Sequence, residues 1–174
     1  LHPKWFRKSL PIFEKTYFLI RRSKLEAHHD NNITGLTDSI ISKVIELLEK
    51  HGDVYISSEG KLSNSFEKYK LNINPSEMQQ VLANATLFIS DSQSMSMEAS
   101  MLGVPSIRFS DFAGRIGVLE ELEHKYGLTF GIPTNKLEKL FSKITELLSI
   151  ENLEADFSNR CERMLSEKID VTAF

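Results

Sequence analysis

Residues 86–109, TLFISDSQSMSMEASMLGVPSIRF, carry two apolar runs on either side of one helical segment. The runs TLFIS at 86–90 and PSIRF at 105–109 are short and mostly apolar, which is typical of strands buried on both faces of a parallel sheet. The helix expected from about 94 to 102 ends at Gly103, and glycine readily adopts the left-handed backbone that closes many helices. Strand, helix and strand in this order predict a parallel β-α-β unit.

The same alternation continues on both sides of this unit. Further strands are expected at 16–20, 53–58, 70–73 and 128–132. Amphipathic helices are expected at about 36–48, 74–82, 116–126, 137–148 and 153–165. Because each crossover helix must traverse the sheet, the pattern predicts an α/β fold in three αβα layers, a Rossmann-like doubly wound parallel sheet.

The ends of the predicted helices carry their own signals. Thr37 or Asp38 is expected to cap the first helix, and Gly52 to take the left-handed conformation after its end. Asn74 and Pro75 form a favourable start for the helix that follows the expected strand at 70–73.

Composition and charge restrict the class of protein. Hydrophobic residues make up 41% of the chain and charged residues 26%, which excludes a disordered or collagenous protein. The formal net charge of -3, with acids and bases interleaved, gives no broad attraction to nucleic acid or to an anionic membrane. No apolar run approaches the roughly 20 residues that span a bilayer, so no transmembrane segment is expected. Cys161 is the only cysteine, which fits a reducing, cytoplasmic location.

The first fifteen residues differ from the rest of the chain. Pro3 and Pro11 stand there among basic and aromatic residues without clear periodicity, which favours a linker or strap. The first residue is leucine rather than methionine, which suggests a piece of a longer protein. We therefore expect residues 1–15 to lead in from a missing N-terminal domain, and residues 16–174 to form one domain.

Ligands of open parallel sheets bind beyond the carboxyl ends of the strands, so the loops after the strands hold the candidate site residues. The turn after the strand at 86–90 is the most informative of them. Ser92, Ser94 and Ser96 lie where a strand becomes a helix, whose first amide groups attract anions. Glu98 follows about one turn later, within reach of a ribose. This pattern indicates a diphosphate cradle; the alternative is that Ser94 is an ordinary N-cap and Glu98 a solvated acid.

The loop after the first strand offers a second group of candidates. Arg21 or Arg22 is a candidate phosphate clamp, and His28 or His29 a polar contact or proton-transfer group. With Asp30, the histidine pair would also suit a metal ion, although surface histidines are usually only solvated and no metal is expected.

Two further candidates are weaker. Arg115 follows the flexible Gly114 and either faces the ligand cleft or is simply exposed. Asp91 is expected to brace its turn through backbone hydrogen bonds rather than to act in catalysis, although it remains a weak catalytic candidate with His28 and His29.

Most of the chain also resembles a known family. The run at 57–130, with FLIRRSKLEAHHD at 18–30 and EKIDVTAF at 167–174, is similar to domain of unknown function 354. That family looks like a branch of the UDP-GlcNAc 2-epimerase and GT-B glycosyltransferase superfamily, whose members have two Rossmann-like domains facing each other across a cleft. The resemblance implies that this chain is the carboxy-terminal domain and that LHPKWF at 1–6 belongs to the segment between the domains.

The resemblance also implies roles for individual residues. In the superfamily the nucleotide binds mainly to the carboxy-terminal domain, with a serine-rich or glycine-rich turn on the diphosphate and a glutamate on the ribose. This implies that Ser92, Gln93 and Ser94 contact the diphosphate and that Glu98 contacts the ribose.

Other residues that line the cleft by the same resemblance are Arg21, His28, His29, Asp111 and Arg115. Epimerases and many relatives have two glycines where Gln93 and Ser94 stand, and glycine lets the backbone approach phosphate most closely. We therefore expect the diphosphate to be bound more loosely here, or in a different arrangement.

The expected function is nucleotide-sugar binding in a glycosyltransferase, with a UDP-linked N-acetylated sugar as substrate and no cofactor. Catalysis would rest on positioning and on stabilising the departing nucleoside diphosphate, with the base supplied by the missing domain. The chain alone is expected to be inactive. The alternatives are a sugar-nucleotide 2-epimerase or hydrolase of the same fold, and a non-catalytic binding module. Whether two copies form a homodimer stays open.

Overall fold

A computed structural model describes residues 15–23 and 35–168. In these residues five strands alternate with six α-helices, and two short 3₁₀ helices precede α2. The strands are β1 (Tyr17–Arg22), β2 (Asp53–Ser58), β3 (Leu87–Ser90), β4 (Ser106–Phe109) and β5 (Thr129–Ile132). The helices are α1 (Asp38–Leu48), η3 (Asn64–Tyr69), η4 (Pro75–Glu77), α2 (Met78–Asn84), α3 (Gln93–Met101), α4 (Gly117–His124), α5 (Leu137–Leu148) and α6 (Leu153–Ser166).

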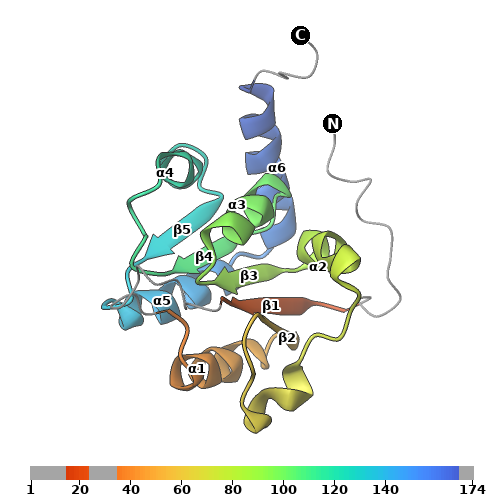
Figure 1. Ribbon diagram of the computed structural model, residues 1–174. Coiled ribbons are helices and arrows are strands. Elements are labelled where there is room, and N and C mark those ends of the chain that lie inside the picture. Colours follow the sequence, from red (N-terminus) through yellow and green to blue (C-terminus); the bar gives the residue numbers. More distant parts are fainter. Residues whose placement is uncertain (1–14, 24–34, 169–174) are drawn as a thin grey trace.

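The five strands form one parallel sheet in the order β2-β1-β3-β4-β5. The chain moves outward from β1 to β2 and then returns past β1 to β3, so the crossovers through α1 and α2 cover opposite faces. Figure 1 shows α2 and α3 on one face of the sheet and α1 and α5 on the other. The predicted three-layer, doubly wound α/β fold is confirmed.

Burial on both faces explains why the strands show no polar alternation. In β1, Phe18 and Ile20 belong to the core that contains the buried residues of α1 and α5. Their neighbours Tyr17 and Leu19 belong to the second core, under α2 and α3. All four side chains are at most 1% exposed, and each such burial contributes about 1.5–3 kcal/mol.

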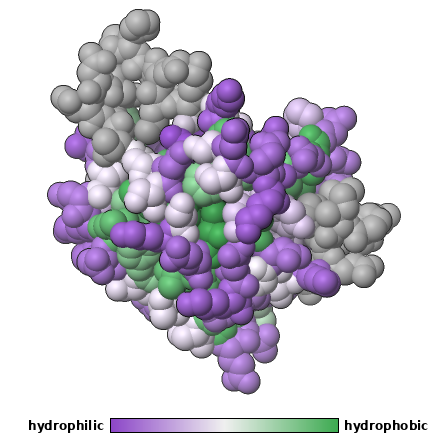
Figure 2. Space-filling model, turned by 90° about the horizontal axis from the view of Figure 1, so that it is seen from below, coloured by the Kyte–Doolittle hydropathy of each residue, from purple (hydrophilic) through white to green (hydrophobic). Residues whose placement is uncertain are grey.

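The outer surfaces of the helices are polar. Figure 2 views the molecule from the side of α1 and α5, and hydrophilic residues dominate that surface, with small apolar areas between them. No helix in residues 15–23 and 35–168 is both long enough and apolar enough to pass through a bilayer.

The strand expected at 70–73 is absent. Lys70 forms a single bridge with Ile56 of β2, where Leu71 donates its amide to the Ile56 carbonyl at 2.8 Å. Pairing ends there because the chain turns at once into η4, whose start is fixed by a capping box between Asn74 and Glu77. The helix start expected at Asn74 is therefore confirmed, whereas the prediction of a strand at 70–73 is wrong.

One of the helix-end predictions also needs correction. Thr37 caps α1 by accepting a hydrogen bond from the Ile40 amide at 3.4 Å, as expected. Gly52 does not have a positive φ; among the described residues Gly103, Gly114 and Gly127 do. A side chain at Gly52 would instead place its Cβ 2.5 Å from the Thr16 carbonyl oxygen, so a close backbone approach is what requires glycine there.

The lone cysteine provides a test of this packing. Cys161 on α6 is 1% exposed, its thiol donates to the Met101 carbonyl at 3.4 Å, and burial raises its pKa to about 11. Since the thiolate is the reactive form, we predict slow alkylation of the native chain at about pH 8 and fast alkylation in denaturant. Equal alkylation rates with and without denaturant would contradict the packing of α6.

The same thiol predicts a pH dependence of stability. Its pKa in the folded chain exceeds the usual value of about 8.5, so the free energy of unfolding should fall as the pH rises from about 8.5 toward 11.

Candidate functional site

The candidate site lies at the carboxyl edge of the sheet, where β3 turns into α3. Ser92 is the N-cap of α3, and its hydroxyl accepts a hydrogen bond from the Met95 amide at 3.5 Å. Ser94 is therefore not the N-cap. The amides of Gln93 and Ser94 open the helix, where amides have no intrahelical acceptor, and such amides bind anions.

The turn itself is held by serine hydroxyls. The Ser90 hydroxyl accepts from the Ser92 amide at 2.8 Å, and the Ser96 hydroxyl donates to the Ser92 carbonyl at the same distance. Ser96 is fully buried, so it supports the turn from inside and does not line the cradle as expected. The Ser92 and Ser94 hydroxyls lie 3.4 Å apart and Ser94 is exposed, so these two remain candidates for ligand contact.

Asp91 joins this turn to two other segments. It is 5% exposed, and its two carboxylate oxygens accept from the Ser23 amide at 2.7 Å and from the Leu36 amide at 3.2 Å. Burial raises the pKa of the Asp91 carboxyl, while these amides oppose the rise. A Cβ on Gly35 would lie 2.5 Å from its Oδ2. Asp91 thus makes the bracing contacts expected of it.

Gln93 points its side chain into the protein. Its Oε1 accepts from Arg108 Nη1 and its Nε2 donates to the Asp91 carbonyl, both at 3.5 Å. What Gln93 offers to a ligand in this arrangement is its backbone amide. The side chain of this first helical residue is therefore directed away from the helix terminus.

Glu98 lies on α3 one turn after its start, and it is exposed. It borders an apolar groove of about 250 Å³ between α2 and α3. The other residues of this groove are Gln79, Met97, Met101 and Leu102. The exposed carboxylate is accessible to a ligand, and it equally fits the alternative of a solvated acid.

Arg21 and Arg22 lie inside β1, which extends two residues beyond its expected end. Arg21 donates to the Ser57 hydroxyl at 2.5 Å and pairs with Glu59 at 2.7 Å. Arg22 pairs with Asp38 at 2.5 Å. Both guanidinium groups are thus engaged by acids at the carboxyl edge. His28 and His29 lie outside the described residues.

The loop after β4 contains two further predicted residues. Asp111 accepts from the amide of Thr134 at 3.3 Å and from its hydroxyl, which links this loop to the segment after β5. Arg115 is exposed and follows Gly114, whose φ of 82° requires glycine. Asp111 is half-buried, so Arg115 is the more accessible of the two charges.

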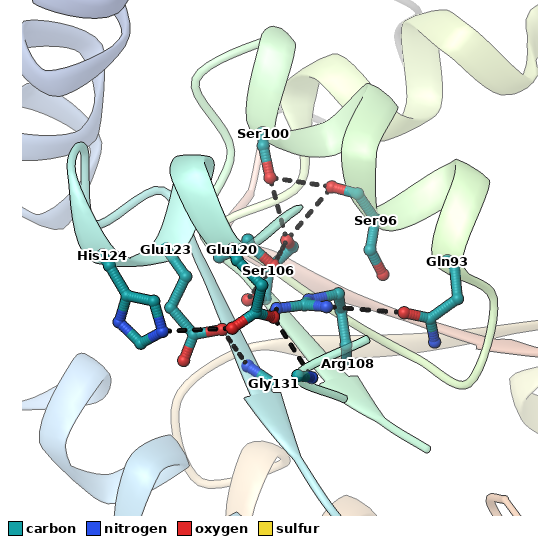
Figure 3. A network of polar contacts seen from close by, with 11 residues as sticks. Gln93, Ser96, Ser100, Ser106, Arg108, Glu120, Glu123, His124 and Gly131 are labelled. Carbon is teal, nitrogen blue, oxygen red and sulfur yellow. Dashed lines mark hydrogen bonds and ion pairs between the residues drawn. The ribbon is translucent and has the colours of Figure 1, made fainter. Parts of the chain in front are cut away.

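The residue that sequence reasoning missed is Arg108. It is a fully buried arginine in β4, and its Nη2 pairs with Glu123 at 2.6 Å and lies 3.5 Å from Glu120 (Figure 3). A charged residue inside the apolar run PSIRF was the available signal, because a buried charge requires partners. Its contact with Gln93 brings this ion pair under the start of α3.

The geometry agrees with the general position of ligand sites in such sheets. The order of the strands reverses between β1 and β3, and ligands of open α/β sheets bind outside the carboxyl ends at that switch point. Asp91, which follows β3, accepts from Ser23, which follows β1. The start of α3 and the hydroxyls of Ser92 and Ser94 lie at this point, and the exposed Glu98 follows about one turn along the helix.

No family model and no curated protein matches the chain. Membership of the domain of unknown function 354 family therefore stays a prediction.

Solved structures, in contrast, share its fold. The glycosyltransferase of kitacinnamycin matches with a TM-score of 0.56 and 15% identity, over 91% of this chain and 41% of its own. The spinosyn forosaminyltransferase SpnP matches with a TM-score of 0.56 and 14% identity, over 97% of this chain and 43% of its own. The UDP-GlcNAc 2-epimerase from Neisseria meningitidis, bound to UDP-GlcNAc, matches with a TM-score of 0.51 and 12% identity, over 94% of this chain and 47% of its own.

The chain therefore has the fold of half of a GT-B glycosyltransferase or a UDP-GlcNAc 2-epimerase. It spans less than half of the length of these three structures. At 12–15% identity the similarity establishes the fold and leaves substrate and reaction to be argued from the site.

The bracing by Asp91 can be tested by substitution. We predict that Asp91→Asn lowers the free energy of unfolding by about 1–3 kcal/mol. The carboxylate accepts hydrogen bonds from two backbone amides, whereas the NH₂ group of a carboxamide would face one of them and lose that hydrogen bond. Urea denaturation measures the change. Asp53→Asn, at the exposed start of β2, is the control and should change stability little. Equal effects of the two substitutions would rule out the bracing role.

Proposed function

We propose that this chain is the carboxy-terminal, nucleotide-sugar-binding domain of a glycosyltransferase, with a UDP-linked N-acetylated sugar as donor. The observation that carries the proposal is the open amino terminus of α3, with the exposed Ser94 and Glu98, at the switch point of the sheet. The fold shared with half of two glycosyltransferases and of an epimerase bound to UDP-GlcNAc supports it.

The diphosphate binds at the start of α3. The amides of Gln93 and Ser94 and the positive end of the helix attract its charge. The hydroxyls of Ser90 and Ser96 fix the turn from inside, so these amides need little rearrangement when the anion arrives. The Ser94 hydroxyl adds a donor on the exposed side.

The ribose binds to Glu98. A helix rises about 1.5 Å per residue, so Glu98 lies about 7–8 Å along α3 from Gln93, comparable to the separation of a ribose diol and its diphosphate. A carboxylate accepts hydrogen bonds from both hydroxyls of such a diol. Glu98 has no buried contact that would have to break first, because it is exposed.

Arginines supply the remaining positive charge. Arg115 is exposed in the loop beside the site and stabilises the departing nucleoside diphosphate. Arg21 contributes from the end of β1, although its pairing with Glu59 offsets much of its charge. Asp111 supports the Arg115 loop through Thr134 rather than contacting phosphate, since two anions repel.

A sugar-nucleotide 2-epimerase or hydrolase is the second candidate. The similarity to the Neisseria meningitidis epimerase favours it, with a TM-score of 0.51 over 94% of this chain. Both candidates need the same nucleotide site and differ in what acts on the sugar. Analysis of the products formed from UDP-GlcNAc, with and without a sugar acceptor, separates a transferase from an epimerase.

Calorimetric titration of the chain with UDP, other nucleoside diphosphates and UDP-GlcNAc tests the site. We predict saturable binding of a nucleoside diphosphate. Loss of the charged acceptor in Glu98→Ala should cost about 1.5–3 kcal/mol, or roughly tenfold to a hundredfold in Kd. Ser94→Ala should weaken binding less, because a neutral hydroxyl contributes about 0.5–1.5 kcal/mol.

The matched control is Glu138→Ala, an exposed acid on α5, which covers the opposite face of the sheet (Figure 1). It should leave the nucleotide Kd unchanged. Absence of any nucleotide binding would favour a non-catalytic module of the same fold. Binding that is indifferent to Glu98→Ala would place the nucleotide elsewhere.

A further inference from the structure

Arg108 is the buried centre of a polar network that lies beneath the start of α3 (Figure 3). On one side, its Nη2 donates to Glu123 Oε2 on α4 at 2.6 Å. On the other side, its Nη1 donates to Gln93 Oε1, on the first residue of α3, at 3.5 Å. One guanidinium thus connects β4 to two different helices.

The acids extend this network to the backbone. Glu123 Oε2 also accepts from the Gly131 amide in β5 at 2.8 Å. Glu120 Oε1 lies 3.5 Å from Arg108 Nη2 and accepts from the Gly114 amide at 3.1 Å. The loop that holds Gly114 is the same loop that carries Asp111 and Arg115. The network therefore ties together both sides of the proposed nucleotide site.

The guanidinium fills its space closely. A Cβ on Gly131 would lie 2.8 Å from Arg108 Nη2 and 3.2 Å from the Ala113 Cβ. Glycine at 131 leaves the room that the planar guanidinium occupies between β5 and the loop after β4.

Stability alone is a poor explanation for this arrangement. A buried ion pair often gives no more stability than well-packed apolar residues of similar volume. In addition, Arg108 Nε is buried and has no hydrogen-bond acceptor among the described residues, which costs free energy. Such a group is better explained by what it holds in place.

We infer that Arg108 is a positioning residue for the nucleotide site. It holds the Gln93 side chain beneath α3, so that the Gln93 and Ser94 amides stay open to the diphosphate. Through Glu120, it also fixes the loop that presents Arg115. This inference rests on the proposed function, and it explains how a turn with a glutamine at the first helical position keeps its phosphate approach clear.

The geometry requires an arginine. Its planar fork reaches Glu123 and Gln93 through two different nitrogens, whereas a lysine ammonium is a single point charge. Arg108→Lys should therefore keep the pairing with Glu123 and lose the hold on Gln93.

The test combines nucleotide affinity with local amide exchange in the 174-residue chain. Removing one partner of a buried pair leaves the other uncompensated, so the main variant is the double substitution Arg108→Met with Glu123→Gln, which keeps volume. The control is Arg160→Met on α6, whose arginine pairs with Asp156 at 2.7 Å and donates to the Gly127 carbonyl. Titration with UDP is measured for each variant. Hydrogen exchange is followed at the amides of Ser92 and Gly114, which donate to the Ser90 hydroxyl and to the Glu120 carboxylate.

We expect the double variant to remain folded, to bind UDP roughly tenfold to a hundredfold more weakly, and to exchange faster at the Ser92 and Gly114 amides with little change in α1. Arg108→Lys should fall between it and the unsubstituted chain. The control should leave both measurements unchanged.

Unchanged affinity or unchanged exchange in the double variant, beside normal binding by the unsubstituted chain, overturns the positioning role alone. Failure of the unsubstituted chain to bind any nucleotide overturns the proposed function, and the inference with it.

Discussion

The contact between Asp91 and the Ser23 amide, at 2.7 Å, joins the ends of β1 and β3 where the order of the sheet reverses. Parallel strands leave their carboxyl ends side by side, and the chain departs from them in opposite directions at this point. A buried carboxylate that accepts from Ser23 and Leu36 holds these departures together. The start of α3, and with it the proposed contacts to the diphosphate and the ribose, is built on this anchor. Burial raises the pKa of the Asp91 carboxyl, and the hydrogen bonds from Ser23 and Leu36 oppose that rise.

The fold could be predicted because each strand contains a short, mostly apolar run and most helices have one apolar face. The strand expected at 70–73 was wrong, because apolar residues there cover a core without continuing the sheet pairing beyond Lys70. Helix α3 carries little apolar periodicity: its buried face consists of Ser96, Ala99 and Ser100. These small residues pack against β4, where the Ser100 and Ser106 hydroxyls meet at 3.2 Å. Ser106 also donates to the Thr129 hydroxyl of β5 at 2.8 Å. That partner is distant in the sequence, so spacing alone could not identify this pairing across the sheet.

The sequence predicted where the candidate residues lie in the fold better than it predicted which groups their side chains contact. Position in the chain placed the serine turn, Glu98 and the loop at 110–115 at one edge of the sheet, as parallel topology requires. Side-chain direction was not available from position. Ser96 is buried, and Gln93 is turned toward Arg108. In the sequence Arg108 is a single polar residue within an expected strand. Its partner Glu123, on α4, is identified only in the folded chain.

The openness of the site follows from its place at one edge of a single sheet. A hollow of about 360 Å³ lies at the other, amino-terminal edge, lined by Thr16, Gly103 and Val104 among others, and it contains none of the proposed ligand contacts. At the carboxyl edge the proposed contacts come from one side: backbone amides, a carboxylate and an exposed arginine. A nucleotide held only there would leave its sugar facing solvent, and transfer of that sugar requires water to be excluded. Under the proposed function a second domain has to supply the opposite wall. Under the same proposal this chain has to fix the nucleotide rigidly, and the inferred role of the buried network around Arg108 is to supply that rigidity.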